Sequence, residues 1–214
     1  MTGGNAELWI LGAGGHGRVV ADAAREAGHW REIVFFDDAL AAGATVNGWL
    51  VRGSSDAFFG TAAVGVQQIV AIGDNLLRQT ALARCPNDRL AVVVHPAATV
   101  SRDAGLGAGS FVAAGAVVCV GARIGPGAII NTGASVDHDC QLGECVHISP
   151  GARLGGGVSV GDRSWVGIGA TVRHQMRVGV DAMVGAGAVV VTPVADNATV
   201  AGNPARPLTA RQHA

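Results

Sequence analysis

The sequence predicts two parts, a small α/β domain followed by a three-sided parallel β-helix. In the first 95 residues, apolar runs alternate with amphipathic segments, and a glycine-rich loop follows the first run. Beyond them an aliphatic residue returns at every sixth position, without insertion or deletion, through Val100, Leu106, Val112, Val118, Ile124, Ile130, Val136, Leu142, Ile148, Leu154, Val160, Val166, Val172, Val178, Val184 and Val190. So regular a series indicates an internal repeat and not a composition effect.

Each unit of six is expected to form one short strand and one corner. A mostly small side chain follows each aliphatic residue by four positions, so two residues in six can point into a narrow prism. Three units close one coil, and coils stack about 4.8 Å apart through parallel pairing. The residue directly after the aliphatic one is often glycine, which predicts a positive φ at Gly107, Gly125, Gly143, Gly155, Gly161, Gly167, Gly179 and Gly185.

The N-terminal region begins with a predicted strand at 7–11, a glycine loop and a helix at 18–27. Gly12, Gly14 and Gly17 match G-x-G-x-x-G, a loop that lets a phosphate approach backbone N–H groups at the start of a helix. A second strand at 32–36 ends in Asp37 and Asp38, where a Rossmann fold places an acid on a ribose. The alternative is an ordinary tight turn and a solvated strand end.

A glycine-rich connection without periodicity leads to a predicted strand at 67–72, a helix at about 76–84 and a strand at 90–94. His95-Pro96 closes the segment because a residue before proline is held extended. Loops at the carboxyl ends of parallel strands share one crevice. The sequence therefore predicts a single Rossmann-like binding site formed by Gly14, Gly15, His16, Gly17, Asp37, Asp38, Gly73 and Asn75.

These patterns divide the chain into a Rossmann-like domain at 1–95, a β-helix at 96–195 and a tail at 196–214. A domain at one end of the coil and a tail at the other would cover strand edges that are otherwise unpaired. With 15 basic and 16 acidic residues, the chain does not favour nucleic acid or an anionic membrane. Met1 to Glu7 shows no export signal, and no run of eighteen apolar residues occurs, which favours a cytoplasmic protein. Reduced thiols are expected for the cysteines, because no CxxC pair occurs; Cys140 takes a small inward position.

Polar residues that interrupt the repeat are candidates for chemistry. Asn131 stands at a corner usually held by glycine, either because Asn tolerates the left-handed conformation or because it has a function. His138 lies between Asp137 and Asp139, and an acid bonded to one ring nitrogen would leave the other nitrogen as a base. His147 lies half a coil from His138, so in one chain the two face different sides. A threefold assembly could join them in a groove between subunits.

His174 lies two whole coils from His138 and shares its column about 10 Å away. No contact between the two is expected at that distance. The pattern assigns His174 no role.

The sequence resembles the left-handed β-helix (hexapeptide-repeat) acyltransferases, and within them the bacterial sialic acid O-acetyltransferases and nucleotide-linked amino-sugar N-acetyltransferases. The resemblance covers nearly the whole chain and rests on the repeat and on the motifs GAGGHGRVV at 12–20, FFDD at 35–38, AIGDN at 71–75, NTGASVDHDC at 131–140 and GNPAR at 202–206. It implies a left-handed coil and a homotrimer. It also implies acetyl-CoA in the groove between prisms and a nucleotide sugar held by the N-terminal domain.

The same resemblance implies roles for individual residues. His138 matches the general base, and Asp139 stands where the most similar amino-sugar enzymes have glutamate, which leaves Asp137 as a rival orienting group. Asn131 and His147 would line the acetyl and acceptor end, and the N–H of Gly156 would hold the thioester oxygen. The border of the CoA would be formed by Ala186, Gly202, Asn203, Pro204 and Arg206. The glycine loop would hold the sugar's diphosphate, and Asp37 or Asp38 would read the base or ribose.

The expected reaction is direct acetyl transfer, in which His138 accepts a proton from a sugar amine and no acyl-enzyme forms. The acceptor is expected to be a UDP- or GDP-4-amino sugar in bacterial surface-glycan biosynthesis, with acetyl-CoA as co-substrate and no metal. O-acetylation of sialic acid or another sugar hydroxyl stays open. More remote alternatives are a zinc carbonic anhydrase, whose three histidine ligands this spacing does not supply, and a sugar-nucleotide scaffold without activity.

Overall fold

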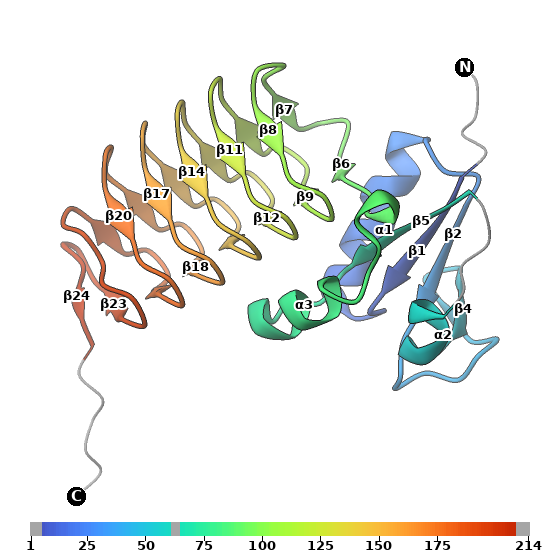
Figure 1. The fold of residues 1–214 in the computed structure, drawn as a ribbon. Coiled ribbons are helices and arrows are strands. Elements are labelled where there is room, and N and C mark those ends of the chain that lie inside the picture. The colour runs from blue at the N-terminus through green and yellow to red at the C-terminus, as the bar shows by residue number, and fades with distance from the viewer. Residues whose placement is uncertain (1–5, 61–64, 209–214) are drawn as a thin grey trace, which may run out of the picture.

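The computed structural model describes residues 6–60 and 65–208. The start of the predicted N-terminal domain, 1–5, and the end of the predicted tail, 209–214, lie outside these ranges. An α/β domain stands at one end of a long solenoid, and the described chain ends at the other (Figure 1). The solenoid is a three-sided parallel β-helix. This arrangement confirms the predicted fold class.

The α/β domain is built on a five-stranded sheet in the order β3-β4-β2-β1-β5. β1 (Glu7–Leu11) pairs in parallel with β2 (Glu32–Phe36) on one side and with β5 (Val66–Val70) on the other. α1 (Gly15–Ala27) connects β1 to β2 and ends at Gly28, whose φ is 67°. Because the three strands are parallel, their carboxyl ends meet at one edge, as predicted.

Three elements form where the sequence showed no periodicity. They are β3 (Thr45–Val46), β4 (Trp49–Gly53) and α2 (Ser55–Phe59). β3 and β4 form an antiparallel hairpin, and β4 extends the sheet by pairing in parallel with β2. Only Val51 and Phe58 are fully buried here, which leaves too short a pattern for sequence reasoning to detect.

The end of the α/β domain differs from the prediction. α3 (Asn75–Leu82) is followed by a 3₁₀ turn, η1 (Asn87–Arg89), and by β6 (Val93–Val94). The strand predicted at 90–94 is therefore shorter, and β6 pairs with a solenoid strand, β9. Leu90 makes only an isolated bridge to Gln68. The chain has to leave one sheet and enter another within these few residues, so no continuous strand can form.

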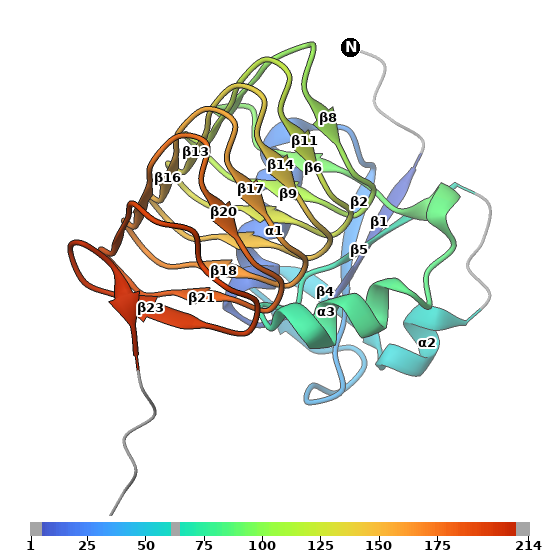
Figure 2. The ribbon, with the colours of Figure 1, turned by 60° about the vertical axis from the view of Figure 1, so that its left-hand side comes forward.

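Three sheets form the sides of the prism (Figure 2). Sheet I contains β6, β9 (Phe111–Val112), β12 (Ile129–Ile130), β15 (His147–Ile148), β18 (Trp165–Val166), β21 (Met183–Val184), β23 (Thr199–Ala201) and β24 (Arg206–Pro207). Sheet II contains β7 (Thr99–Val100), β10 (Val117–Val118), β13 (Ser135–Val136), β16 (Arg153–Leu154), β19 (Thr171–Val172) and β22 (Val189–Val190). Sheet III contains β8 (Gly105–Leu106), β11 (Arg123–Ile124), β14 (Gln141–Leu142), β17 (Ser159–Val160) and β20 (Arg177–Val178).

The interior of the prism contains the residues that the repeat predicted. The second residue of most solenoid strands is aliphatic and buried, and small side chains fill the corners between them, including Ala116, Ala122, Ala134, Ala152 and Ala170. Cys140 belongs to this cluster, and the four cysteines are free thiols. Each coil hydrogen-bonds to the next, as Arg123 N–H to the carbonyl of Cys140 at 2.8 Å illustrates. Burial of apolar surface holds the coil together.

The prediction of positive φ directly after each aliphatic residue is wrong. Left-handed residues instead stand three positions after it, at every sixth residue from Gly109 to Gly187, and include Asp139 and Cys145. Glycines directly after the aliphatic residue have another cause. A Cβ on Gly161, for example, would lie 2.6 Å from the backbone nitrogen of Val180 in the next coil. Those corners need glycine because adjacent coils approach too closely for a side chain.

The solenoid closes at its C-terminal end with a small hairpin. β23 pairs in parallel with β21 and antiparallel with β24, so the last sheet I edge is not left open. The segment between them holds a cis Asn203-Pro204 bond, and the N–H of Ala205 donates to the carbonyl of Val189. Across the described residues, no helix has the length and apolar character needed to cross a membrane.

Candidate active site

His138 stands at the corner between sheets II and III, which we call edge II–III. Its Nδ1 lies 2.9 Å from Oδ2 of Asp139, and both side chains are mostly exposed, at 58% and 72%. Asp139 has a φ of 57°, a left-handed conformation that turns its carboxylate back toward the preceding imidazole. The hydrogen bond to Asp139, with the charge of Asp137, raises the pKa of His138 above its ordinary value.

The structure separates the two candidate orienting acids. Asp137 accepts a hydrogen bond from the backbone N–H of His138 at 2.7 Å, whereas Asp139 meets the ring itself. Asp137 therefore shapes the corner and Asp139 faces the imidazole. With Nδ1–H donated to Asp139, the Nε2 atom of His138 keeps its lone pair for a proton from outside.

Two glycines make room for this pair. A Cβ on Gly156, in the next coil, would overlap the imidazole of His138. A Cβ on Gly121, in the preceding coil, would overlap the carboxylate of Asp139. The predicted oxyanion residue Gly156 thus lies directly beside the predicted base.

Asn131 and His147 form a second polar group, on sheet I and the corner between sheets I and II (edge I–II). Oδ1 of Asn131 accepts from the N–H of Thr132 at 2.8 Å, which fixes the amide so that Nδ2 points to Nε2 of His147 at 3.1 Å. Nε2 then accepts, and the ring is neutral with its proton on Nδ1. Asn131 has no positive φ, so the left-handed explanation for it is wrong and the side-chain contact explains this residue better.

His147 is held neutral by its surroundings. It is 6% exposed, its ring packs 3.9 Å from that of Trp165, and its Nδ1 has no partner among the described residues. Burial first, then the charge of Arg78, lowers the pKa of His147 to about 3. Trp165 was not predicted, because an outward residue on a strand carries no mark in the repeat.

His16 lies at the seam between the two domains. Its ring meets Phe111 of sheet I edge-on at 5.5 Å, and burial with the charge of Arg78 lowers its pKa to about 4. Gly17 is needed because a Cβ there would overlap the carbonyl of Gly12. Gly14 and Gly15 are exposed at the start of α1.

A pocket of about 280 Å³ opens at the carboxyl ends of β1, β2 and β5. Asp37 accepts from the N–H groups of Ala13 and Ala39 at 2.8 and 2.9 Å, so the backbone occupies both its oxygens. Asp38 accepts from the N–H of Ser55 through Oδ1 at 2.8 Å. The lining residues are Leu11, Gly12, Phe36, Asp37, Asp38, Ala39 and Ile72. Of the residues predicted for a single site, only Asp37 and Asp38 line this pocket; the glycine loop meets it through Gly12, and Ile72 lines it just before the third loop.

Gly73 and Asn75 point the other way, toward the prism. The amide of Asn75 donates to the carbonyls of Arg163 and Ser164 at 2.8 and 3.2 Å. The carbonyl of Gly73 accepts from the buried guanidinium of Arg78 at 3.1 Å. Arg78 was missed by sequence reasoning, although its spacing of three from Asn75 on one helical face was a signal.

The residues expected to border CoA gather along edge I–II. Ala186 stands at that edge three coils from Thr132, and the segment from Gly202 to Arg206 packs against β22 there. Gly202 has a φ of 94°, and its carbonyl accepts from the N–H of Val189 at 3.0 Å. Asn131 therefore shares an edge with these residues, whereas His138 and Gly156 lie on edge II–III, on the far side of sheet II.

His174 stands on edge II–III two coils beyond His138, exposed and apart from it. Within the residues that the structure covers, no three His, Cys, Asp or Glu side chains gather closely enough to hold a metal ion. An imidazole with one nitrogen fixed and the other open is suited to accepting a proton.

The hexapeptide solenoid and its edge imidazole define the class of protein as a hexapeptide-repeat acyltransferase. Two protein families match the sequence: the PglD N-terminal domain over residues 7–85 and the bacterial transferase hexapeptide (six repeats) over residues 121–156. The chain belongs to the hexapeptide-repeat sugar acetyltransferases. Comparison with curated proteins finds no match.

Solved structures resemble the whole chain. The acetyltransferase domain of PglB from Neisseria gonorrhoeae FA1090 is 45% identical with a TM-score of 0.90, covering 95% of this chain and 100% of that one. A mutant perosamine N-acetyltransferase from Caulobacter crescentus, bound to CoA and GDP-perosamine, is 38% identical with a TM-score of 0.87, covering 98% and 99%. WeeI from Acinetobacter baumannii AYE is 28% identical with a TM-score of 0.85, covering 95% and 100%.

Proposed function

We propose that this protein transfers an acetyl group from acetyl-CoA to the amine of a nucleotide-linked amino sugar, a UDP- or GDP-4-amino sugar of bacterial surface-glycan synthesis. The observation that carries the proposal is the His138–Asp139 pair at 2.9 Å, exposed on edge II–III beside Gly156. Two similar proteins support the substrates: PglB was solved with acetyl coenzyme A, and the perosamine enzyme with CoA and GDP-perosamine. In this proposal both substrates are cytoplasmic metabolites, and the enzyme acts in the cytoplasm.

The chemical step follows from the state of the imidazole. Nδ1–H of His138 donates to Asp139, and Nε2 accepts the proton that the sugar amine loses as its nitrogen attacks the thioester carbon. The C–S bond then breaks, and CoA leaves as the thiol or thiolate. The N–H of Gly156 donates to no other group in the described chain and would stabilise the oxyanion. Direct transfer requires no covalent intermediate with the protein.

The division of polar residues between two edges supports a site shared by neighbouring subunits. His138 and Gly156 lie on edge II–III, while Asn131 and Ala186 lie on edge I–II, so one chain alone does not bring them together. A threefold assembly of prisms places one edge of each chain against another edge of its neighbour. In the proposed homotrimer, each groove contains His138 from one chain and Asn131 with His147 from the next.

Acetyl-CoA would lie along edge I–II in this groove. From Thr132 to Ala186 the edge rises three coils, or about 14 Å, which gives an elongated pantetheine arm a continuous track. Its acetyl end would reach Asn131, and its nucleotide end would reach the segment from Gly202 to Arg206. The carboxyl ends of β1, β2 and β5 line the pocket of about 280 Å³, where the base of the acceptor nucleotide would lie. Asp38, which is exposed and lines this pocket, is the residue suited to reading the base or ribose.

Release of CoA thiol tests the proposal. Purified protein is mixed with acetyl-CoA and, separately, with UDP- and GDP-4-amino sugars, free sialic acid and a sugar without an amine. We expect release with a nucleotide amino sugar, and mass spectrometry should show its N-acetyl product. His138→Ala should lose about 10²–10⁴-fold in rate while it keeps the wild-type oligomeric state. Release with sialic acid alone would show O-acetylation instead, and a fully active His138→Ala would remove the base.

A further inference from the structure

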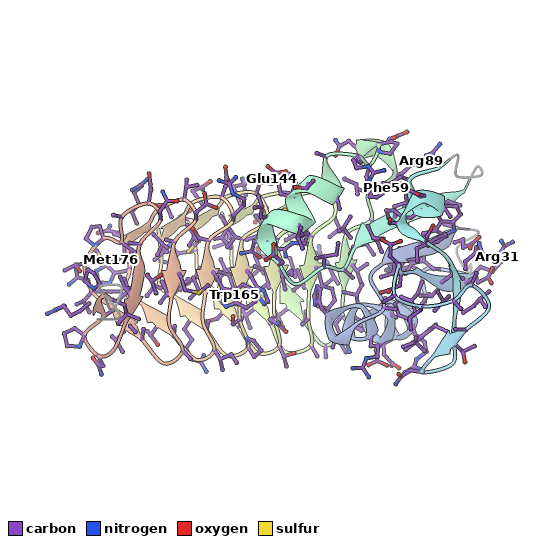
Figure 3. All side chains as sticks on the ribbon, turned by 90° about the horizontal axis from the view of Figure 1, so that it is seen from below. Arg31, Phe59, Arg89, Glu144, Trp165 and Met176 are labelled. Carbon is purple, nitrogen blue, oxygen red and sulfur yellow. The ribbon has the colours of Figure 1, made fainter. Side chains whose placement is uncertain are left out.

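α3 lies lengthwise against the solenoid, along the corner between sheets III and I, which we call edge III–I (Figure 2). In Figure 3 the helix passes between the labelled Glu144 and Trp165. Asn75, Arg78 and Leu82 face this edge, and their spacing of three and four residues places them on one side of the helix. All three are at least nine-tenths buried, at 8%, 1% and 5% exposed.

The edge offers one acceptor for each coil. Gly127, Cys145 and Arg163 are 18 residues apart, all three are left-handed, and none of their carbonyls accepts a backbone hydrogen bond from the described chain. Arg78 donates to the carbonyls of Gly127 and Cys145 at 2.7 Å each. Asn75 donates to the carbonyl of Arg163 at 2.8 Å. Two helix side chains therefore bind three successive coils.

The helix and the solenoid have matching repeats. A helical turn rises about 5.4 Å, and a coil rises about 4.8 Å. Over the seven residue steps from Asn75 to Leu82 the helix advances about 10 Å, which equals about two coils. This match lets consecutive donors on one helix face meet consecutive acceptors on one edge.

Leu82 fixes which coils are bound. A Cβ on Gly109 or Gly127 would lie 2.8 or 2.9 Å from a methyl carbon of Leu82, so the leucine seats against two corners that have no side chain. The next corner residue along this edge is Cys145, which has a side chain. If α3 shifted by one coil toward the C-terminus, Leu82 would meet that side chain. Hydrogen bonds alone would allow such a shift, because the carbonyls repeat.

The position of the helix also sets the position of the proposed substrate pocket. Arg78 donates to the carbonyls of Ile72 and Gly73 at 2.8 and 3.1 Å, and Ile72 lines that pocket. On the other side, Arg78 holds Cys145, two residues before His147 in the same coil. One guanidinium thus connects the pocket wall to the coil that contains the proposed acetyl site.

We infer that Asn75, Arg78 and Leu82 are positioning residues that set how far along the solenoid the nucleotide-sugar pocket lies, so that the sugar amine reaches the acetyl group. This inference rests on the proposed function for its catalytic consequence. Its structural part, the fixed seating of α3, does not depend on any substrate.

A double-mutant cycle on Gly127 and Leu82 tests the inference. Gly127→Ala introduces a Cβ that would lie 2.9 Å from Leu82 and 2.8 Å from Sγ of Cys145. Gly28→Ala is its control, because Gly28 is equally left-handed at φ 67° with nothing within 4 Å of its Cβ and lies in neither proposed substrate site. We expect Gly127→Ala to lose about tenfold or more in kcat with a nucleotide amino sugar while the KM for acetyl-CoA stays unchanged. Leu82→Ala removes the overlap with Leu82 but not the one with Cys145, so it should restore part of the loss. Gly28→Ala should keep its kcat.

Crystal structures of the same variants separate the two possible failures. We expect the α/β domain of Gly127→Ala to be displaced along the solenoid relative to wild type, and the Gly127→Ala/Leu82→Ala protein to return toward the wild-type position. If wild type acetylates no nucleotide sugar, the proposed function fails. Displacement of the α/β domain in Gly127→Ala would then still show whether Leu82 fixes the position of α3 on the solenoid. The inference would be overturned if wild type is active, the α/β domain of Gly127→Ala is not displaced, and Gly127→Ala matches Gly28→Ala in kcat.

Discussion

The imidazole of His138 occupies the space that a side chain on Gly156 would need, one coil away on the same edge of the prism. The base and the nearest candidate oxyanion donor are therefore linked by packing. Gly156 does not have a positive φ, so its backbone permits alanine. Only the imidazole forbids a side chain there.

Gly156→Ala is expected to remove activity without unfolding the protein. The new methyl group displaces an exposed ring, which costs little stability. A shift of about 1 Å in a catalytic group can nevertheless cost about 10²-fold in rate. Steady-state kinetics and the thermal unfolding temperature measure the two effects. In a His138→Ala background the same change should cost almost nothing more, because the ring is already absent. Additive losses would contradict the contact.

Asp139→Asn should move the pH dependence of the reaction. The hydrogen bond to Asp139 is the largest cause of the raised pKa of His138, so a carboxamide should lower that pKa. The imidazole must be neutral to accept a proton, and the acidic limb of kcat/KM should therefore move to lower pH. Asp137→Asn is the matched control, because its oxygen binds backbone, and it should move the limb less. An acidic limb unchanged in Asp139→Asn would exclude this pairing.

Acid should destabilise the protein through His147. Its folded pKa is lowered from 6.5 to about 3, so the unfolded chain binds a proton that the folded chain rejects. The stability from this group is full above about pH 6.5 and is lost as pH falls toward 3. Between pH 7 and 5 the loss is about 2 kcal/mol. Chemical unfolding curves at several pH values measure it, and His147→Gln should show a smaller fall; equal falls would contradict the assignment.

Two glycine classes in the solenoid should respond differently to alanine. At Gly169 the change adds only left-handed strain, about 1–2 kcal/mol. At Gly161 it forces a Cβ into the backbone of Val180 in the adjacent, hydrogen-bonded coil, which we expect to cost about 3 kcal/mol or more. Differential scanning calorimetry compares the two variants. A Gly161→Ala protein as stable as Gly169→Ala would show that the coils separate easily.

The sequence predicted most of the solenoid because a period of six leaves a mark at every coil. It did not predict which corner residue is left-handed, because glycine occurs at corners for two reasons, a positive φ and a lack of space, and composition does not separate them. β3, β4 and α2 escaped prediction because only Val51 and Phe58 are fully buried there. For the candidate site, His138 was predicted from its flanking acids, but Arg78 and Trp165 were not.

By itself, the sequence determined the coil, the sites of its buried aliphatic residues and the imidazole that interrupts it, since each depends on spacing along the chain. The tertiary structure decided what depends on approach between distant segments. It paired His138 with Asp139 and not with Asp137. Asn75, predicted to bind substrate, instead donates a hydrogen bond to the prism. Asn131 and His138 lie on different edges. The physical reason is that hydrogen bonds and excluded volume act between coils 18 residues apart and between domains, where no local pattern records them.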